Sequence, residues 1–182
     1  MLGDKPIFII GYMGSGKSTI GRKLADELNF NFIDTDFFIE NRFRQRVQDM
    51  FKTVGEETFR KREHMVIEEL SGMTQSIIAT GGGLPCFYNN MEIIKTCGIS
   101  IYLEVSNEIL TQRLELCKRT RPSVKDKSGE ELFKHVEEGM ALRAPIYQQA
   151  DIIICANKLM TTEDEKVLAK KIASQLVEYD NK

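Results

Sequence analysis

A glycine-rich segment near the N-terminus carries the residues best suited to chemistry. Residues 11–19 read Gly-Tyr-Met-Gly-Ser-Gly-Lys-Ser-Thr, between apolar residues 7–10 and a helix-like stretch that begins near Ser18. In this Gly-x-x-x-x-Gly-Lys-Ser/Thr pattern, backbone N–H groups and a helix N-terminus hold a polyphosphate. Lys17 is placed to reach the β- and γ-phosphates, and the Ser18 hydroxyl to bind Mg²⁺. The segment therefore predicts binding of a nucleoside triphosphate.

A glycine turn that merely joins a strand to a helix is the alternative explanation of this segment. Such a turn explains Gly11, but it leaves Lys17 and Ser18 at this spacing without a reason. The residues predicted to hold the phosphates are Gly14, Ser15, Gly16, Lys17, Ser18 and Thr19.

Two carboxylates follow the apolar residues 30–33, in the sequence Asp34-Thr35-Asp36. At the carboxyl end of a strand beside the P-loop strand, they lie where open α/β sheets bind ligands. Because side chains two residues apart need not serve one ligand, one carboxylate suits Mg²⁺, through water, and the other suits accepting a proton from a hydroxyl. The alternative role is an N-cap for the next helix, which Asp36 could also serve.

Three consecutive glycines, Gly81, Gly82 and Gly83, follow the next predicted strand after Thr80. Consecutive glycines cost chain entropy, and a plain turn needs only one or two. The triplet predicts a ligand pressed against the backbone, with N–H groups available to it.

Two arginines and one basic segment complete the candidate groups. Arg60 lies three residues before Glu63, which predicts an ion pair that orients the guanidinium. Arg143 precedes Ala144-Pro145, at the end of a helix that Pro145 is expected to help terminate. Each arginine taken alone fits an ordinary surface charge, although a guanidinium fork also suits a carboxylate ligand. The polar, basic residues 118–127, broken by Pro122, are typical of either a solvated loop or a mobile lid over the phosphates.

Five short apolar segments supply the elements that must position these groups. They are residues 7–10, 30–33, 77–79, 99–103 and 152–155, and each is separated from the next by a segment able to form a helix. Strands that are apolar on both faces are typical of a parallel sheet covered by helices. The sequence therefore predicts an α/β fold of three layers, with a five-stranded parallel sheet covered by helices on both faces.

Helix starts are indicated by capping boxes that begin at Thr53, Ser128 and Thr162. The last helix is expected over about residues 162–177. Its apolar positions predict a stripe that contacts the core, made of Val167, Leu168, Ile172, Leu176 and Val177.

Composition limits the class of protein. The chain has 182 residues, of which 42% are hydrophobic and 29% charged, as is ordinary for one soluble domain. A formal charge of −2 gives no general attraction to nucleic acid or to an anionic membrane. The 4 cysteines are dispersed, which predicts reduced and mostly buried thiols. The N-terminal residues 1–6 are too short a segment for a signal peptide and no apolar run is long enough to span a membrane, so we expect a cytoplasmic protein. We also expect a monomer.

Six motifs in this order resemble shikimate kinase over nearly the whole chain, from about Pro6 to Val177. They are the P-loop, Asp-Thr-Asp, Gly-Glu-x-x-Phe-Arg-x-x-Glu, the triple glycine, Thr-Arg-Pro and Arg-Ala-Pro-x-Tyr. The P-loop alone occurs in many unrelated proteins, whereas the other five in series are specific. The resemblance implies a single P-loop kinase domain, residues 1–182, of the nucleoside-monophosphate-kinase-like fold. It implies transfer of the ATP γ-phosphate to the 3-hydroxyl of shikimate, with Mg²⁺.

The resemblance also implies residue roles. Lys17 and Ser18 match the phosphate- and Mg²⁺-binding pair, and Asp34 resembles the acid near the metal. Asp36 resembles the acid that holds the shikimate hydroxyls and acts as base. Arg60, Arg143 and the glycines Gly81, Gly82 and Gly83 match the substrate pocket, which includes a helical segment over about residues 36–62. Arg121 resembles a catalytic, phosphate-binding arginine of a lid over about residues 118–128. Arg119, Asn157 and Lys158 are positional candidates for contact with adenine.

Three other functions compete with this one. A gluconate kinase, or another small-metabolite kinase of the same fold, would share the P-loop and an acid after the second strand. A GTPase-like switch is disfavoured because residues 78–81 do not supply Asp-x-x-Gly and residues 157–160 lack the final Asp of Asn-Lys-x-Asp. A catalytically inactive relative that only binds nucleotide is disfavoured because every expected catalytic position holds a competent residue.

Overall fold

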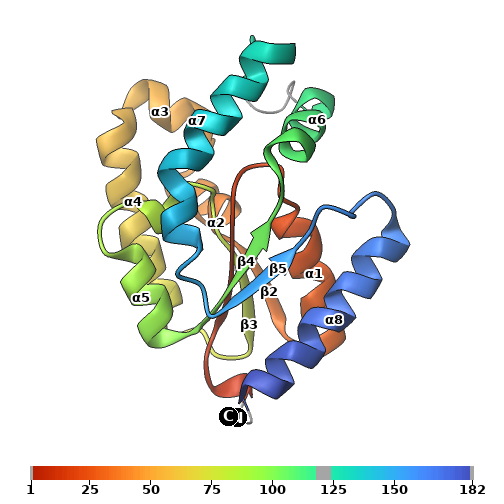
Figure 1. Cartoon of the computed structure of the whole chain (residues 1–182). Helices are drawn as coiled ribbons and strands as arrows, with labels where there is room; N and C mark the ends of the chain where they lie inside the picture. The colour runs from red at the N-terminus through yellow and green to blue at the C-terminus, as the bar shows by residue number, and fades with distance from the viewer. Residues whose placement is uncertain (1, 118–123, 181–182) are drawn as a thin grey trace.

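The structure is a computed structural model that describes residues 2–117 and 124–180, and its centre is a five-stranded parallel sheet (Figure 1). The strand order is β2-β3-β1-β4-β5. The strands are β1 (Ile7–Ile10), β2 (Asn31–Asp34), β3 (Ser76–Ala79), β4 (Ile99–Glu104) and β5 (Ile152–Cys155). All five predicted strands are present and the predicted fold is confirmed, with small shifts in the ends of β2, β3 and β4.

The P-loop strand lies in the middle of the sheet. β1 pairs in parallel with β3 on one side and with β4 on the other, so that Ile9 is opposite Ala79 and Ile101. Asp34 at the end of β2 is opposite Ala79, the last residue of β3. This register brings the P-loop, the Asp-Thr-Asp segment and the triple glycine to one edge of the sheet, which the sequence predicted from strand ends alone.

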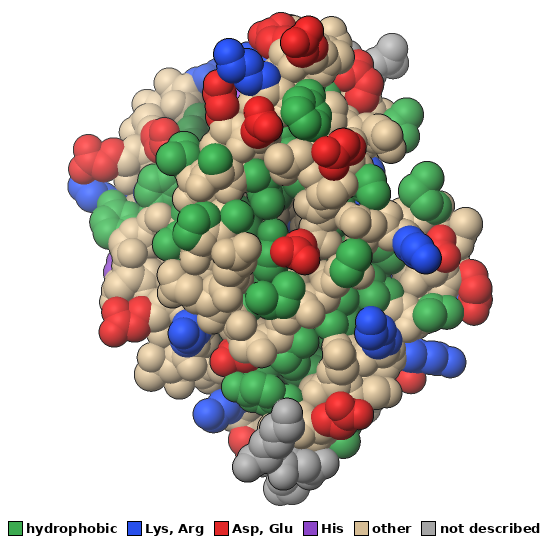
Figure 2. All heavy atoms as spheres, in the orientation of Figure 1, with side chains coloured by type: hydrophobic (Ala, Val, Ile, Leu, Met, Phe, Trp, Pro, Cys, Tyr) green, Lys and Arg blue, Asp and Glu red, His purple; other side chains and the backbone are tan. Residues whose placement is uncertain are grey.

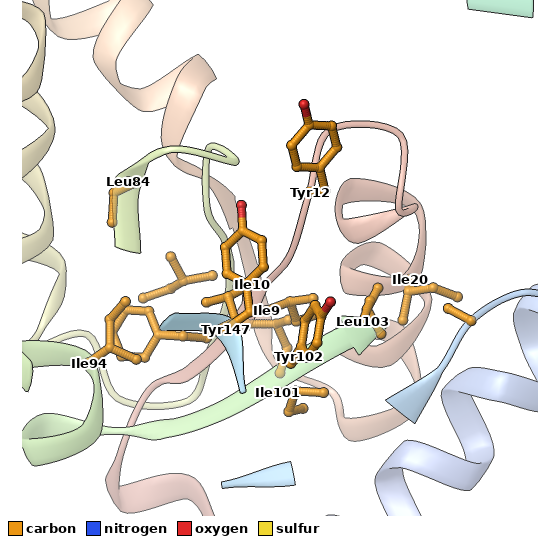
Figure 3. Packing of buried hydrophobic residues seen from close by; sticks show 14 of the residues in the cluster. Ile9, Ile10, Tyr12, Ile20, Leu84, Ile94, Ile101, Tyr102, Leu103 and Tyr147 are labelled. Atoms are coloured by element: carbon orange, nitrogen blue, oxygen red, sulfur yellow. The ribbon is translucent and has the colours of Figure 1, made fainter. Parts of the chain in front are cut away.

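Helices cover the sheet on both sides. The helices and short 3₁₀ turns are η1 (Leu2–Asp4), α1 (Lys17–Leu28), α2 (Thr35–Phe43), α3 (Val47–Thr53), α4 (Gly55–Leu70), η2 (Leu84–Cys86), α5 (Asn90–Cys97), α6 (Asn107–Cys117), α7 (Gly129–Tyr147) and α8 (Thr162–Asp180). α1 and α8 pack together on one side, and α4, α5 and α7 lie on the other (Figure 1). Strand residues such as Ile9, Ile10 and Ile101 fill the core between these layers (Figure 3).

The expectation that every strand is apolar and buried on both faces holds for the centre of the sheet but not for its edges. All residues of β1 and β3 are buried, whereas β2 and β5 are partly exposed because each has a neighbour on one side only. Ile153 in β5 is 47% exposed. Hydrophobic side chains are visible along the middle of the face where β4 and β5 lie, with charged groups around them (Figure 2).

The three predicted capping boxes have different outcomes. At α8 the box exists one residue earlier, because Thr161 Oγ1 accepts from the Asp164 N–H at 3.2 Å and Asp164 Oδ2 accepts from the Thr161 N–H at 2.8 Å. At α7 Ser128 is the N-cap, but its side chain makes no capping hydrogen bond. Thr53 is not a cap at all: it ends α3, and Val54 precedes α4.

Two expectations about α7 and α8 hold only in part. Pro145 does not end its helix, because α7 continues to Tyr147 and places Arg143 inside its last turns. In α8, Ile172 and Leu176 are buried as expected, but Val167 and Val177 are 60% and 50% exposed. The helix turns 100° per residue, so Val167 and Val177 fall outside the stripe that faces α1.

The four cysteines are free thiols, as expected, but not mostly buried: Cys155 is exposed and the other three are half-buried. Among the residues that the structure describes, no helix is long and apolar enough to cross a membrane.

Candidate active site

The P-loop is built from left-handed glycines and a helix N-terminus. Gly14 and Gly16 have φ angles of 82° and 95°, which side chains rarely tolerate. Gly16 is the N-cap of α1, so Lys17 is the first helical residue. Lys17 is only 9% exposed, and its Nζ donates a 2.7 Å hydrogen bond to the Tyr12 carbonyl. The side chain of Lys17, which is predicted to bind the phosphates, is therefore bonded to the backbone of the P-loop itself.

Ser18 and Asp34, the two predicted metal-binding residues, are in direct contact. Ser18 Oγ donates a 2.6 Å hydrogen bond to Asp34 Oδ2. Asp34 Oδ1 accepts from the backbone N–H groups of Asp36 and Phe37, at 3.0 and 3.4 Å, and so caps α2. The N-cap role that the sequence allowed for Asp36 belongs to Asp34, because the strand ends there. Asp36 is instead in the first turn of α2.

Side chains lie close to the backbone of two of the three glycines, Gly81 and Gly83. A Cβ on Gly81 would lie 2.6 Å from Asp36 Oδ1 and 3.2 Å from Glu63 Oε1. A Cβ on Gly83 would lie 2.5 Å from Arg60 Nη1. The close approach seen here is made by side chains of the protein, so the approach of a ligand stays a prediction. The N–H of Gly81 donates to Thr35 Oγ1 at 2.8 Å.

Arg60 is held by charge and by aromatic rings. Its Nη1 donates to Glu63 Oε2 at 2.7 Å, the ion pair that the sequence predicted, and its Nη2 donates to Glu56 Oε1 at 3.0 Å. Its guanidinium carbon lies 4.0 Å from the centre of the Phe87 ring. Since Arg60 is only 8% exposed, this packing fixes the direction of the guanidinium.

Glu63, which the sequence assigned only to orienting Arg60, is a buried carboxylate at the centre of these contacts. Its side chain is 2% exposed. Burial raises the pKa of Glu63 to about 7, with Asp36 adding to the rise and Arg60 and Arg143 opposing it. Arg60 bonds this carboxylate, and Asp36 and Glu63 both lie beside Gly81, so groups from α2 and α4 meet here. The charge of Arg143 in α7 also acts on it.

Two tyrosines that were not predicted as site residues, Tyr12 and Tyr147, lie near Arg143 of α7. Its guanidinium carbon lies 5.3 Å from the centre of the Tyr12 ring. Tyr147, one turn further along α7, is fully buried and donates its hydroxyl hydrogen to the Gly82 carbonyl. Burial raises the pKa of Tyr147, so it stays a neutral donor. The Arg-Ala-Pro-x-Tyr spacing was the available signal for Tyr147.

The predicted adenine contacts are only partly described. Asn157 Oδ1 accepts from the Ser106 N–H at 2.9 Å, which joins the loops after β4 and β5, while Lys158 is exposed. Arg113 in α6 was missed: its Nη2 donates to the Ala156 and Asn157 carbonyls at 2.8 and 3.1 Å, and its Nη1 to the Gly14 carbonyl at 3.5 Å. No motif marks this arginine.

The predicted lid, residues 118–128, lies mostly outside the described part of the chain. Arg119 and Arg121 belong to residues 118–123, which the structure does not describe. At the C-terminal end of the segment, Val124 is fully buried in the core and Lys127 pairs with Glu131 at 3.1 Å.

Comparison with known proteins resolves which kinase this site belongs to. The family described as "Shikimate kinase" matches residues 13–179. The chain belongs to the shikimate kinase family. A shikimate kinase of Parabacteroides distasonis is 44% identical over 160 residues, which are 88% of this chain and 92% of that protein. The predicted family is confirmed, and with it the expected activity of a shikimate kinase in aromatic amino-acid biosynthesis.

Solved structures of shikimate kinases have the same fold. The enzyme from Bacteroides thetaiotaomicron superposes with a TM-score of 0.91 at 37% identity, over 94% of this chain and 98% of that one. The enzyme from Acinetobacter baumannii, solved in complex with shikimate, superposes with a TM-score of 0.85 at 31% identity, over 98% and 96% of the two chains.

Proposed function

We propose that this shikimate kinase transfers the ATP γ-phosphate to the 3-hydroxyl of shikimate where the P-loop meets the triple glycine. One observation carries this proposal. A Cβ on Gly82 would lie 3.3 Å from the Met13 backbone nitrogen and 3.5 Å from the Gly11 carbonyl oxygen. The neighbouring Gly81 and Gly83 border Asp36 and Arg60. One three-residue segment thus joins a phosphate-binding loop to a carboxylate and an arginine, which are groups suited to an acidic polyol.

The nucleotide half of the site fits ATP with Mg²⁺. Ser18 and Asp34 present two oxygen ligands in contact with each other, and Mg²⁺ is usually bound by one or two protein oxygens, with phosphates and waters completing its shell. Among the described residues there is no group of three or more His, Cys, Asp or Glu that could hold a metal ion without such help. Bound there, Mg²⁺ would neutralise phosphate charge, and Lys17 would leave the Tyr12 carbonyl for the phosphates.

The acceptor half of the site would fix both ends of shikimate. Asp36 accepts hydrogen bonds from its hydroxyls and takes the proton as the 3-oxygen attacks phosphorus. Arg60 and Arg143 bind its carboxylate, where two guanidinium groups give direction as well as charge. The similar Acinetobacter enzyme was solved with shikimate bound, which supports this choice of acceptor. Because phosphoryl transfer needs mainly alignment and charge neutralisation, these contacts account for most of the chemistry.

Four assignments rest on the sequence alone and stay predictions. They are Arg121 as a phosphate-binding lid residue, Arg119, Asn157 and Lys158 as adenine contacts, a monomeric state and a cytoplasmic location.

A coupled assay of ADP release tests the proposal. With ATP, Mg²⁺ and shikimate we expect turnover, and with gluconate, an acid without the ring, we expect none above the ATPase background. Phosphorus NMR of the product should show a single phosphate ester at the 3-position of shikimate. Turnover with gluconate and not with shikimate would overturn the assignment.

A further inference from the structure

Tyr12 lies between the two halves of the site and has contacts with both. It follows β1 in the P-loop, and Figure 3 shows its ring apart from the strand residues Ile9 and Ile10. The residue is only 2% exposed, although it belongs to a surface loop. The P-loop pattern itself leaves this position free, so the pattern does not explain why a large buried aromatic ring is here.

On the nucleotide side, the contact of Tyr12 is made by its backbone. Its carbonyl oxygen accepts a 2.7 Å hydrogen bond from Lys17 Nζ and a 3.2 Å hydrogen bond from the Ser15 N–H. The first of these has a charged donor, which makes it the stronger kind of hydrogen bond. Since Lys17 must turn to the phosphates when ATP binds, the Tyr12 peptide changes its main partner at that moment.

On the acceptor side, the contact is made by the ring. The Arg143 guanidinium lies 5.3 Å from the ring centre. Burial raises the pKa of the Tyr12 hydroxyl, and the positive charge of Arg143 opposes the rise. Arg60 and Arg143, which are proposed to bind the shikimate carboxylate, form the carboxylate clamp. The Tyr12 ring therefore supports one of its two guanidinium groups, that of Arg143.

Helix α7 has a glycine, Gly139, where it packs against the Tyr12 ring. Gly139 and Arg143 are four residues apart and so share one face of α7. A Cβ on Gly139 would overlap the Tyr12 hydroxyl and lie 3.0 Å from its ring carbon Cζ. Gly139 has no positive φ angle, so its lack of a side chain is explained by the tyrosine and not by the backbone.

We propose that Tyr12 is a positioning residue that couples the nucleotide site to the carboxylate clamp, through its carbonyl on Lys17 and its ring under Arg143. This inference rests on the proposed roles of Lys17 and Arg143. Either substrate acts on a partner of this one residue, ATP on the Lys17 that bonds its carbonyl and shikimate on the Arg143 that lies over its ring, so the second substrate binds to a site that the first has rearranged. By linkage, nucleotide then tightens shikimate binding and shikimate tightens nucleotide binding by the same factor.

The test is the dissociation constant of shikimate, measured by calorimetry with and without a non-hydrolysable ATP analogue and Mg²⁺. In the native protein we expect the analogue to tighten shikimate binding by about five-fold or more. Tyr12→Leu removes the ring but keeps the carbonyl, so this factor should fall to about two or less while the affinity for the analogue alone changes little. Tyr12→Phe keeps the ring and should keep the coupling.

Gly139→Ala supplies an independent test from the opposite side of the contact. The added methyl displaces the tyrosine, so the coupling should fall as in Tyr12→Leu. Adding Tyr12→Phe removes the hydroxyl that the methyl overlaps, and this double variant should regain coupling. In the Tyr12→Leu background Gly139→Ala should have no further effect. Tyr179→Leu, the same change on the far helix α8, is the matched control and should leave the coupling intact.

Three results from the variants would overturn the proposal. They are undiminished coupling in Tyr12→Leu, coupling equally reduced by Tyr179→Leu, and no rescue of Gly139→Ala by Tyr12→Phe in folded protein. A native protein that binds both ligands without any coupling would also refute it, yet would leave the kinase assignment intact. A native protein that fails to phosphorylate shikimate would instead refute the proposed function.

Discussion

The guanidinium of Arg60 lies directly against the backbone of Gly83, with Nη1 only 2.5 Å from the point where a Cβ would stand. Arg60 also forms an ion pair with Glu63 and packs against the Phe87 ring. A side chain at position 83 would therefore meet the guanidinium of Arg60, which is proposed to bind the shikimate carboxylate.

Gly83→Ala should therefore weaken shikimate binding without affecting ATP. We expect KM for shikimate to rise about ten- to hundred-fold, the effect of losing one charge-assisted hydrogen bond, while KM for ATP stays nearly fixed. Gly72→Ala is the matched control, because a Cβ there meets nothing within 4 Å. Steady-state kinetics with each substrate varied in turn separates the two constants. Equal changes in both constants would show that Gly83 serves folding alone.

Lys17→Ala should reduce kcat through lost stabilisation of the transferring phosphoryl group. Removal of one preorganised group of this kind costs about a hundred- to thousand-fold in rate. Because Lys17 donates to the Tyr12 carbonyl in this structure, thermal stability should also be measured. A variant that is equally stable and turns over at the native rate would remove Lys17 from the mechanism.

Asp36→Asn should lower kcat more than it weakens ATP binding, since an amide cannot take a proton. General-base contributions are about 10²–10⁴-fold. Asp34→Asn is the comparison: it keeps a side chain able to cap α2 but weakens the metal site, so its activity should respond to added Mg²⁺. Rescue of Asp36→Asn by Mg²⁺, with no rescue of Asp34→Asn, would exchange the two roles.

Arg143→Lys keeps the charge beside Tyr12 but loses the fork. KM for shikimate should rise about ten- to hundred-fold, again the value of one charge-assisted hydrogen bond, and KM for ATP should change little. An acceptor analogue without the carboxylate gives the control, because nothing remains for the fork to bind. If both acceptors were weakened equally, Arg143 would support the structure or the phosphates instead.

Glu63→Gln should change the pH dependence of stability. Burial raises the pKa of Glu63 from 4.5 to about 7, so the folded protein holds a proton that the unfolded chain has already lost in this range. The contribution of this proton to stability is complete below 4.5 and is lost as pH rises to about 7. Thermal unfolding should show that the native protein loses more stability between pH 5 and pH 8 than Glu63→Gln does.

The control for this experiment is Glu57→Gln on the same helix. Glu57 is exposed, and its hydrogen bond with Lys61 lowers the pKa of Glu57. Its effect on stability should be small and of opposite sign, with any contribution lost as pH falls. A slope for Glu57→Gln that matches that of Glu63→Gln would mean that burial of Glu63 is not its cause.

Much of this protein follows from its sequence alone. The five apolar segments determined the strands, because buried parallel strands need apolar residues on both faces. The P-loop, the acids and the glycines were located by their positions after those strands, since parallel strands end at one edge of the sheet. The ion pair of Arg60 with Glu63 followed from helical spacing, which is a local property.

Only the tertiary structure decided how groups from different elements meet. Caps depend on where a helix starts to the residue, so Asp34 and Thr161 act where Asp36 and Thr162 were considered. Burial of Glu63 and Tyr12 arises from layers packed by α4 and α7, and no local pattern reports it. Gly139 illustrates the limit: in sequence it is a glycine in a helix, and only the packing of α7 on the P-loop reveals that it makes room for a tyrosine 127 residues earlier in the chain.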